Sequence, residues 1–205
     1  MKELQIKAYL VEYLLKKNRE ITLGAEVPFQ YGSRRADIIS ISSEISIAYE
    51  IKGSGDSTIR LDYQIDSYKK YFDYCFIVCE ESNLKQIRKV IGKEVGLLVV
   101  SLDGSIKQVR KSKQFMRLNK EILASTLAVT LLKKYVNNKK LRSQHELCEA
   151  LSKQMTLAGI KSISRYNLAT RYSQLSNLLK RETLTKITPD DIMTITNRAP
   201  SALSR

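Results

Sequence analysis

Three charged side chains stand in a segment that otherwise has the composition of a buried hairpin. Asp37 lies near the start of the segment ADIISISSEISIAYEIKGSG, and Glu50 and Lys52 lie near its end. Side chains alternate between the two faces of a strand, so Glu50 and Lys52 share one face. Burying an unpaired charge is costly. The three charges therefore predict either an ion-pair cluster or a metal site.

Asp37 and Glu50 carry the type of ligand that a hard divalent cation prefers. Two carboxylates at the end of a sheet offer oxygen atoms to Mg²⁺ or Mn²⁺. Such an ion lowers the pKa of a bound water and neutralises charge on a phosphate under attack. Lys52 would hold the nucleophilic water or stabilise the charge of the transition state. The pattern is short, and a surface cluster of ion pairs is the alternative interpretation.

The metal hypothesis depends on the register of the hairpin. If residues 42–44 form a three-residue loop, Asp37 faces Tyr49 and points into the core. If only Ser43 and Glu44 form the turn, Asp37 falls opposite Glu50. A one-residue slip moves a whole strand to the other face. A metal site therefore requires the two-residue turn, or a bulge near Asp37 that restores the same arrangement.

The elements that position these residues alternate in type before about residue 115. Apolar strands that alternate with helical patterns are typical of crossover connections and a partly parallel sheet. Pro28 suggests that the extended segment around it is an edge strand. The expected helices cover residues 2–17, 58–72 and 83–93, and the expected extended segments cover residues 24–35, 36–52, 74–79 and 97–102.

After about residue 115 we find only helical patterns. A capping box, in which Glu146 follows Ser143 by three residues, marks one helix start. The expected helices cover residues 120–136, 143–155 and 166–181, and a last one begins at Thr188. We therefore expect an α/β fold: a mixed β-sheet flanked by helices in a domain of residues 1–115, followed by a basic helical domain of residues 116–205.

Two motifs resemble a known superfamily. Asp37 followed by Glu50-Ile51-Lys52 resembles the core of the PD-(D/E)xK nucleases, which have the restriction-endonuclease-like fold; Ala36 stands where a Pro often precedes the Asp. The segment from Gln64 to Tyr68 resembles the Q-x-x-x-Y motif of the RecB-like and lambda-exonuclease-like branch. Residues four apart share a helix face. The resemblance covers roughly residues 1–102 and implies a mixed sheet flanked by helices.

The resemblance also implies an activity and a set of catalytic residues. The activity is metal-dependent hydrolysis of DNA phosphodiester bonds. A catalytically silent module of the same fold, which docks on nucleic acid or a partner, is the alternative function. The catalytic set carried over from the motifs is Asp37, Glu50, Lys52, Gln64 and Tyr68.

The resemblance further implies a metal centre. Mg²⁺, with Mn²⁺ as a substitute, would be bound by Asp37, Glu50 and the backbone carbonyl of Ile51. Such enzymes often have a further acid before the Asp. Glu12 in the first helix and Glu26 ahead of the hairpin both qualify, and the sequence does not choose between them.

The charge of the chain is concentrated in its C-terminal part. The net charge is +14, of which residues 1–115 carry +4 and residues 116–205 carry +10. Basic surfaces of this kind favour polyanionic partners. We expect DNA as the partner, with RNA as an alternative, and a homodimer or a protein partner stays open. The candidate nucleic-acid contacts are Arg34, Arg35, Arg165 and Arg171, although Arg34 and Arg35 would also serve as partners of acids.

The sequence also bears on the compartment. No apolar run approaches the roughly 18 residues of a membrane-spanning helix. The N-terminal segment is amphipathic and acidic residues interrupt it, so it does not resemble a signal peptide. Cys75, Cys79 and Cys148 form no zinc pattern with the single histidine, His145. We expect a cytoplasmic protein.

Overall fold

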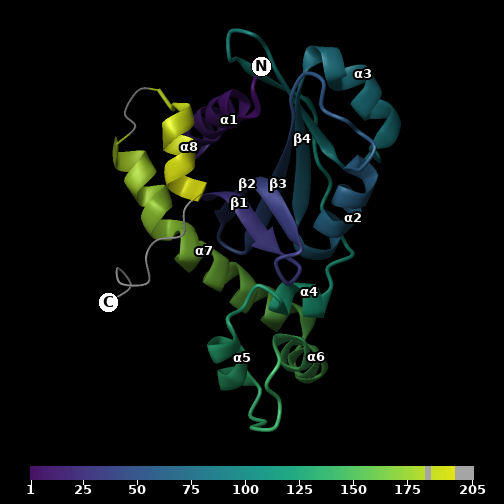
Figure 1. Ribbon diagram of the computed structural model, residues 1–205, viewed down its shortest axis with the longest axis vertical. Coiled ribbons are helices and arrows are strands. Elements are labelled where there is room, and N and C mark those ends of the chain that lie inside the picture. The colour runs from purple at the N-terminus through teal and green to yellow at the C-terminus, as the bar shows by residue number, and fades with distance from the viewer. Residues whose placement is uncertain (183–185, 197–205) are drawn as a thin grey trace.

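The computed structural model describes residues 1–182 and 186–196 of the chain. Within these ranges, six strands form one sheet in the order β1-β2-β3-β4-β5-β6, and helices cover both of its faces (Figure 1). The strands are β1 (Thr22–Phe29), β2 (Arg34–Ser42), β3 (Ile45–Lys52), β4 (Tyr74–Glu80), β5 (Gly96–Val100) and β6 (Ile106–Arg110).

The helices follow the order expected from the sequence in the first half and extend beyond the sheet in the second. They are α1 (Glu3–Lys17), α2 (Leu61–Tyr71), α3 (Glu81–Val90), α4 (Lys120–Ala124), α5 (Val129–Tyr135), α6 (Gln144–Gln154), α7 (Leu157–Glu182) and α8 (Pro189–Thr196). Inside the described ranges, no helix is both long enough and apolar enough to cross a membrane. The expected fold class, a mixed sheet flanked by helices with a helical C-terminal extension, is confirmed.

The sheet combines an antiparallel meander with a parallel centre. Strands β1, β2 and β3 pair antiparallel, whereas β3, β4 and β5 pair parallel through the crossover helices α2 and α3. Strand β6 returns antiparallel to β5. The sequence did not indicate β6, because its five residues are mostly polar and none is fully buried. Backbone pairing with β5, rather than apolar burial, holds this strand.

Two apolar layers enclose the sheet. On one face, α1 and α8 pack on β1, β2 and β3 through a cluster that includes Leu10, Ile38 and Ile192. On the other face, α2 and the helices α4, α6 and α7 form a second cluster with the sheet, which includes Phe29 and Tyr68. The sheet therefore presents one face to the first helix of the chain and the other to the Q-x-x-x-Y helix.

The edge strand β1 is covered by α7, which runs past it toward α4 and α6 (Figure 1). The hydroxyl of Ser176 on α7 accepts a hydrogen bond of 3.0 Å from the backbone N–H of Leu23. Farther along the same strand, Pro28 has no backbone N–H, so no donor is left unpaired there at the edge of the sheet. The expected edge position of the segment around Pro28 is confirmed, and α7 limits the exposure of this edge.

The expected helix over residues 120–136 is wrong as a single element, because the chain breaks between α4 and α5. The backbone carbonyls of Ser125, Thr126 and Leu127 accept hydrogen bonds from side chains of α6 and α7 instead of from the next helical turn. Ser and Thr hydroxyls also bond back to the preceding turn here. Tertiary contacts thus override a locally favourable helical sequence.

The C-terminal helices share their core with the sheet. Within the described residues, the buried apolar side chains after residue 115 all belong to the two clusters that cover the sheet. Leu123, Leu147 and Leu168 join the cluster of α2, and Ile192 and Ile195 join that of α1. The helical extension therefore forms part of the layers that hold the sheet.

Candidate active site

The β2–β3 hairpin adopts the register that a metal site requires. Ile38 pairs with Tyr49 and Ser42 pairs with Ile45, so residues 43–44 form a two-residue turn. The same register, continued by one residue, sets Asp37 opposite Glu50. Ser43 has a φ of 52°, as tight turns of this length require. Of the two registers that the sequence left open, the hairpin has the one with the two-residue turn.

A third carboxylate joins the same level of the sheet. Ala25 pairs with Ile38 and Val27 pairs with Ala36, which sets Glu26 opposite Asp37. Glu26, Asp37 and Glu50 thus come from three adjacent strands at one level. Strand register brings these three positions to the same level of the sheet.

The backbone is irregular at this level. Glu26 lies inside β1 with a φ of 51°, which is uncommon for a residue other than Gly and costs on the order of 1–3 kcal/mol. Ala25 packs in the cluster of α1, whereas Val27 packs in the cluster of α2. The strand therefore changes faces at Glu26. Such strain is stored where the surrounding structure fixes it, and here it adjoins Asp37.

The carboxylate of Glu50 is the centre of a hydrogen-bond network. It is 2% exposed. Its Oε1 accepts hydrogen bonds from Lys52 Nζ at 2.9 Å and from Gln64 Nε2 at 2.6 Å. Its Oε2 accepts a hydrogen bond from the hydroxyl of Tyr68. The Glu-x-Lys strand and the Q-x-x-x-Y helix therefore meet at one carboxylate.

Asp37 is held between this network and the backbone of β3. Its Oδ2 accepts a hydrogen bond of 2.7 Å from the N–H of Ile51. Burial, together with the charge of Glu50, raises the pKa of Asp37 to about 8. In a strand the N–H and the C=O of one residue point to the same side, so the carbonyl of Ile51 is directed toward Asp37.

The donor set fits a divalent cation. Asp37 and Glu50 are buried carboxylates close enough for the charge of one to oppose ionisation of the other. A cation bound between them would remove this repulsion, and their oxygen atoms suit Mg²⁺ or Mn²⁺.

A buried lysine occupies the other side of Asp37. Glu3, Glu26 and Asp37 each place one carboxylate oxygen within 4.8 Å of the other two. Lys7 on α1, which is 3% exposed, forms ion pairs with Glu3 at 2.5 Å and with Glu26. Although burial lowers the pKa of Lys7, the hydrogen bonds of Glu26 and Glu3 outweigh it, and the net shift is upward.

Sequence reasoning missed Glu3 and Lys7, although a signal was present. Lys7 stands at helical spacing from Leu10 and Leu14, both on the buried face of α1. A lysine in such a stripe needs acidic partners, because a buried ammonium is costly when unpaired. Glu3, one turn earlier, is the partner at (i, i+4).

The structure separates the two candidates for the additional acid. Glu26 lies with Asp37 in the acidic group. Glu12 instead pairs with Lys16 at 2.6 Å, and this hydrogen bond is the main cause that lowers the pKa of Glu12. Within the described residues, Glu12 belongs to no such group with Asp37, whereas Glu26 does.

Arg34 and Arg35 flank the entrance to the Glu50 network. The Arg35 side chain is 66% exposed and its Nη1 lies 3.4 Å from Oε2 of Glu26. Both arginines line a cavity of about 110 Å³ together with Gln64 and Tyr68. A phosphate at the Glu50 network would lie beside these two cations.

Arg165 is not a surface residue, so its expected role in nucleic-acid binding is wrong. Its side chain is 0% exposed. The Nε atom lies 3.3 Å from Oδ2 of buried Asp73, and Nη2 donates to the carbonyl of Tyr71. Nothing in the sequence indicated that Arg165 is buried, because its acidic partner, Asp73, lies 92 positions away.

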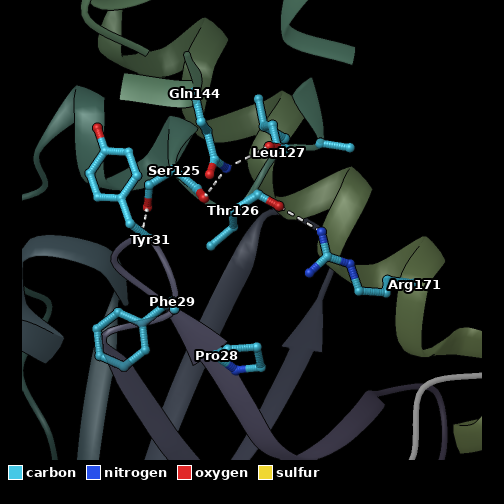
Figure 2. A pocket seen from close by; sticks show the side chains of 10 residues that line it. Pro28, Phe29, Tyr31, Ser125, Thr126, Leu127, Gln144 and Arg171 are labelled. Atoms are coloured by element: carbon cyan, nitrogen blue, oxygen red, sulfur yellow. Dashed lines mark hydrogen bonds between the residues drawn. The ribbon is translucent and has the colours of Figure 1, made fainter. Parts of the chain in front are cut away.

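Arg171 lines a larger cavity, of about 490 Å³, between the β1–β2 turn and the C-terminal helices (Figure 2). Its Nη2 donates to the carbonyl of Thr126 at 2.6 Å and to Oδ1 of Asn167 at 3.1 Å. Gln144 donates to the carbonyls of Ser125 and Leu127, the two neighbours of Thr126 in the chain (Figure 2). Arg171 therefore has a structural role in the α4–α5 break and still borders open space.

Comparison with known proteins identifies a phage family. The sequence model of the family described as "Bacteriophage P4 protein cII" matches residues 1–196. The chain is 28% identical over 186 residues to "Protein cII" of Enterobacteria phage P4, which covers 86% of this chain and 70% of that protein. A solved structure of a Silicibacter pomeroyi protein of unknown function, SPO1766, matches 58% of this chain and 77% of its own, with 19% identity and a TM-score of 0.44.

Proposed function

The chain belongs to the bacteriophage P4 protein cII family, and we propose that it is a metal-dependent nuclease that hydrolyses DNA phosphodiester bonds. The observation that carries this proposal is the alignment of Glu26, Asp37 and Glu50 across three adjacent strands. Lys52 and the pair Gln64 and Tyr68 meet the same carboxylate. The resemblance to PD-(D/E)xK nucleases rests on these residues, and we propose that the chain is a member of that superfamily.

The proposed metal is Mg²⁺, with Mn²⁺ as a substitute. Asp37, Glu50 and the carbonyl of Ile51 would bind it, and Glu26 would be the additional acid. The bound ion would lower the pKa of a water and neutralise charge on the phosphate.

The protein's own groups contribute orientation and charge. Gln64 and Tyr68 donate to different oxygens of Glu50 and thereby fix the plane of its carboxylate. Lys52 lies between Glu50 and Gln64, with its Nζ 3.3 Å from Oε1 of Gln64. From there its ammonium stabilises negative charge that develops on the attacked phosphate.

The partner and location that we propose follow from charge and cysteine chemistry. A net charge of +14 favours DNA, or RNA as a second polyanion. Cys75, Cys79 and Cys148 are free thiols, as expected in a reducing cytoplasm.

The test is cleavage of plasmid and linear DNA with Mg²⁺, compared between wild type and Glu50→Gln. We expect the variant to lose cleavage by at least about 100-fold, the scale seen when a preorganised catalytic group is removed. Glu44→Gln, in the exposed β2–β3 turn, is the matched control and should cleave normally. Mg²⁺-independent cleavage, or equal activity of both variants, would refute the proposal. DNA binding by wild type without cleavage would favour the catalytically silent module.

A further inference from the structure

An exposed tyrosine stands beside the Glu50 network. Tyr63 lies on α2, immediately before Gln64, and is 60% exposed. The guanidinium carbon of Arg34 lies 4.1 Å from the centroid of the Tyr63 ring. A guanidinium at this distance stacks on the ring and restricts its orientation. Tyr63 is thus a held aromatic ring that is still largely open to solvent.

Arg34 connects this ring to the candidate active site. Arg34 lines the small cavity that also contains Gln64 and Tyr68, and both of these side chains bond to Glu50. The Nε atom of Arg34 is buried and has no hydrogen-bond partner. A group seated at the cavity would therefore lie next to both a guanidinium and the Tyr63 ring.

The surface around Tyr63 combines apolar and cationic groups with one acid, Asp62, directly beside the ring in the sequence. Ile59 is 90% exposed, and Arg60 is exposed on the same approach to α2. The Arg35 side chain is 66% exposed. Cationic side chains bind the phosphates of single-stranded and duplex DNA alike. The exposed ring of Tyr63 can in addition stack on a flat apolar group. Unpaired bases are such partners, and every base has a π-face that stacks on an aromatic side chain.

We propose that Tyr63, held by Arg34, is a stacking platform for an unpaired base of the bound strand, next to the phosphate at the Glu50 network. The substrate class is then single-stranded DNA, or DNA whose bases are unpaired beside the attacked bond. This inference deepens the proposed nuclease function and rests on it for the position of the phosphate. The stacking itself can be measured without cleavage.

The first experiment measures binding in EDTA, so that no metal-dependent cleavage takes place. The probes are a fluorescein-labelled oligothymidylate and a duplex of equal length. Base–aromatic stacking contributes about 1–3 kcal/mol, so Tyr63→Ala should weaken single-strand binding about 5- to 150-fold. Tyr63→Phe should restore it, and duplex binding should change by less than about 2-fold in both variants.

The matched control lies on the opposite face of the sheet. Tyr13 on α1 also carries a cation over its ring, with Lys17 Nζ 4.4 Å from the centroid. Tyr13→Ala removes a comparable pair on the helix that covers the other face of the sheet from α2. Single-strand affinity should not change in this variant.

The second experiment detects the stack directly. The chain contains no tryptophan, so Tyr63→Trp introduces a single tryptophan at the platform. A base stacked on the indole should quench its emission when oligothymidylate is added, and the duplex should quench it much less. This readout does not depend on how well Tyr63→Ala folds.

The outcomes separate the two proposals. Equal loss of single-strand and duplex binding in Tyr63→Ala, or no quenching in Tyr63→Trp, would overturn the platform. No oligonucleotide binding by wild type would also overturn it. If Tyr63-dependent binding is found but Mg²⁺ supports no cleavage, the nuclease proposal alone fails. If wild type cleaves DNA and Tyr63→Ala binds single strands normally, the platform alone fails.

Discussion

The ionisation of Asp37 should destabilise the metal-free fold, so Asp37→Asn should stabilise it. The pKa of Asp37 is raised from 3.8 to about 8 by burial and by the charge of Glu50. Below about pH 4, Asp37 is protonated in both the folded and the unfolded states and contributes nothing. Between about pH 4 and 8 the unfolded state releases its proton while the folded state retains it. Stability therefore falls as the pH rises, and the full penalty is present above about pH 8.

The size of the penalty follows from the shift. Each pKa unit corresponds to about 1.4 kcal/mol, so the full shift sets a ceiling of about 6 kcal/mol above pH 8. At about pH 5 most of this penalty is absent. Asn retains an oxygen that can accept the N–H of Ile51, so the hydrogen bond at that site is preserved. We expect Asp37→Asn to gain several kcal/mol at about pH 8.5 and little at about pH 5.

The assay is thermal unfolding in EDTA at these two pH values. For a chain of this length, 1 kcal/mol shifts Tm by about 2–4 °C, so the variant should melt at least about 5 °C above wild type at the higher pH. Asp66→Asn is the matched control. Asp66 is half exposed and its pKa is lowered, mainly by its hydrogen bond to Lys70. Its substitution should leave Tm unchanged or slightly lower it.

Two results would refute this reasoning. The first is a Tm for Asp37→Asn at or below that of wild type at about pH 8.5. The second is an equal gain at both pH values, because a gain without pH dependence would come from packing rather than from the charge of Asp37.

Three further predictions concern the same groups. At about pH 8.5, Mg²⁺ at about 100 times its Kd should stabilise wild type by about 2.7 kcal/mol and so raise its Tm, whereas the Tm of Asp37→Asn should not rise. Calorimetric scans with and without Mg²⁺ measure both effects. Lys52→Ala should lose cleavage yet keep DNA affinity within about 2-fold, since it removes one positive charge among many; an equal loss in cleavage and filter-binding assays would make Lys52 a phosphate contact only. Arg165→Met should lower the stability measured by urea unfolding by about 3 kcal/mol, the lower end of the cost of breaking a buried ion pair, because Lys161 still pairs with Asp73. Asp73→Asn in the same chain should recover part of the loss.

The site could be predicted from the sequence where its geometry is local. Glu50 and Lys52 share a face because the strand period is fixed, and Gln64 and Tyr68 share one because the helix period is fixed. Whether Asp37 lies on the same face as Glu50 depends on the length of the turn at Ser43 and Glu44. The sequence did not determine that length.

The rest depends on contacts between distant segments. Lys7 and Glu26 pair across 19 positions, and Arg165 and Asp73 pair across 92. No local period reveals such partners, so Lys7 was overlooked and Arg165 was placed on the surface. The break between α4 and α5 is of the same kind, since the side chains that bond its carbonyls come from α6 and α7.

The Asp73 ion pair has a consequence for the order in which the chain folds during synthesis. The carboxylate of Asp73 accepts hydrogen bonds from the N–H and the hydroxyl of Ser46, at the start of β3. Its compensating cations, Lys161 and Arg165, are on α7 and are synthesised about 90 residues later. Long-range contacts of this type are slow to form.

A ribosome-bound chain that ends before α7 therefore lacks both cations that pair with Asp73 in the folded protein. The start of the strand that carries Glu50 and Lys52 gains these ion pairs only after α7 has been synthesised. We expect the candidate site to reach its final stability only after residue 165 has left the ribosome.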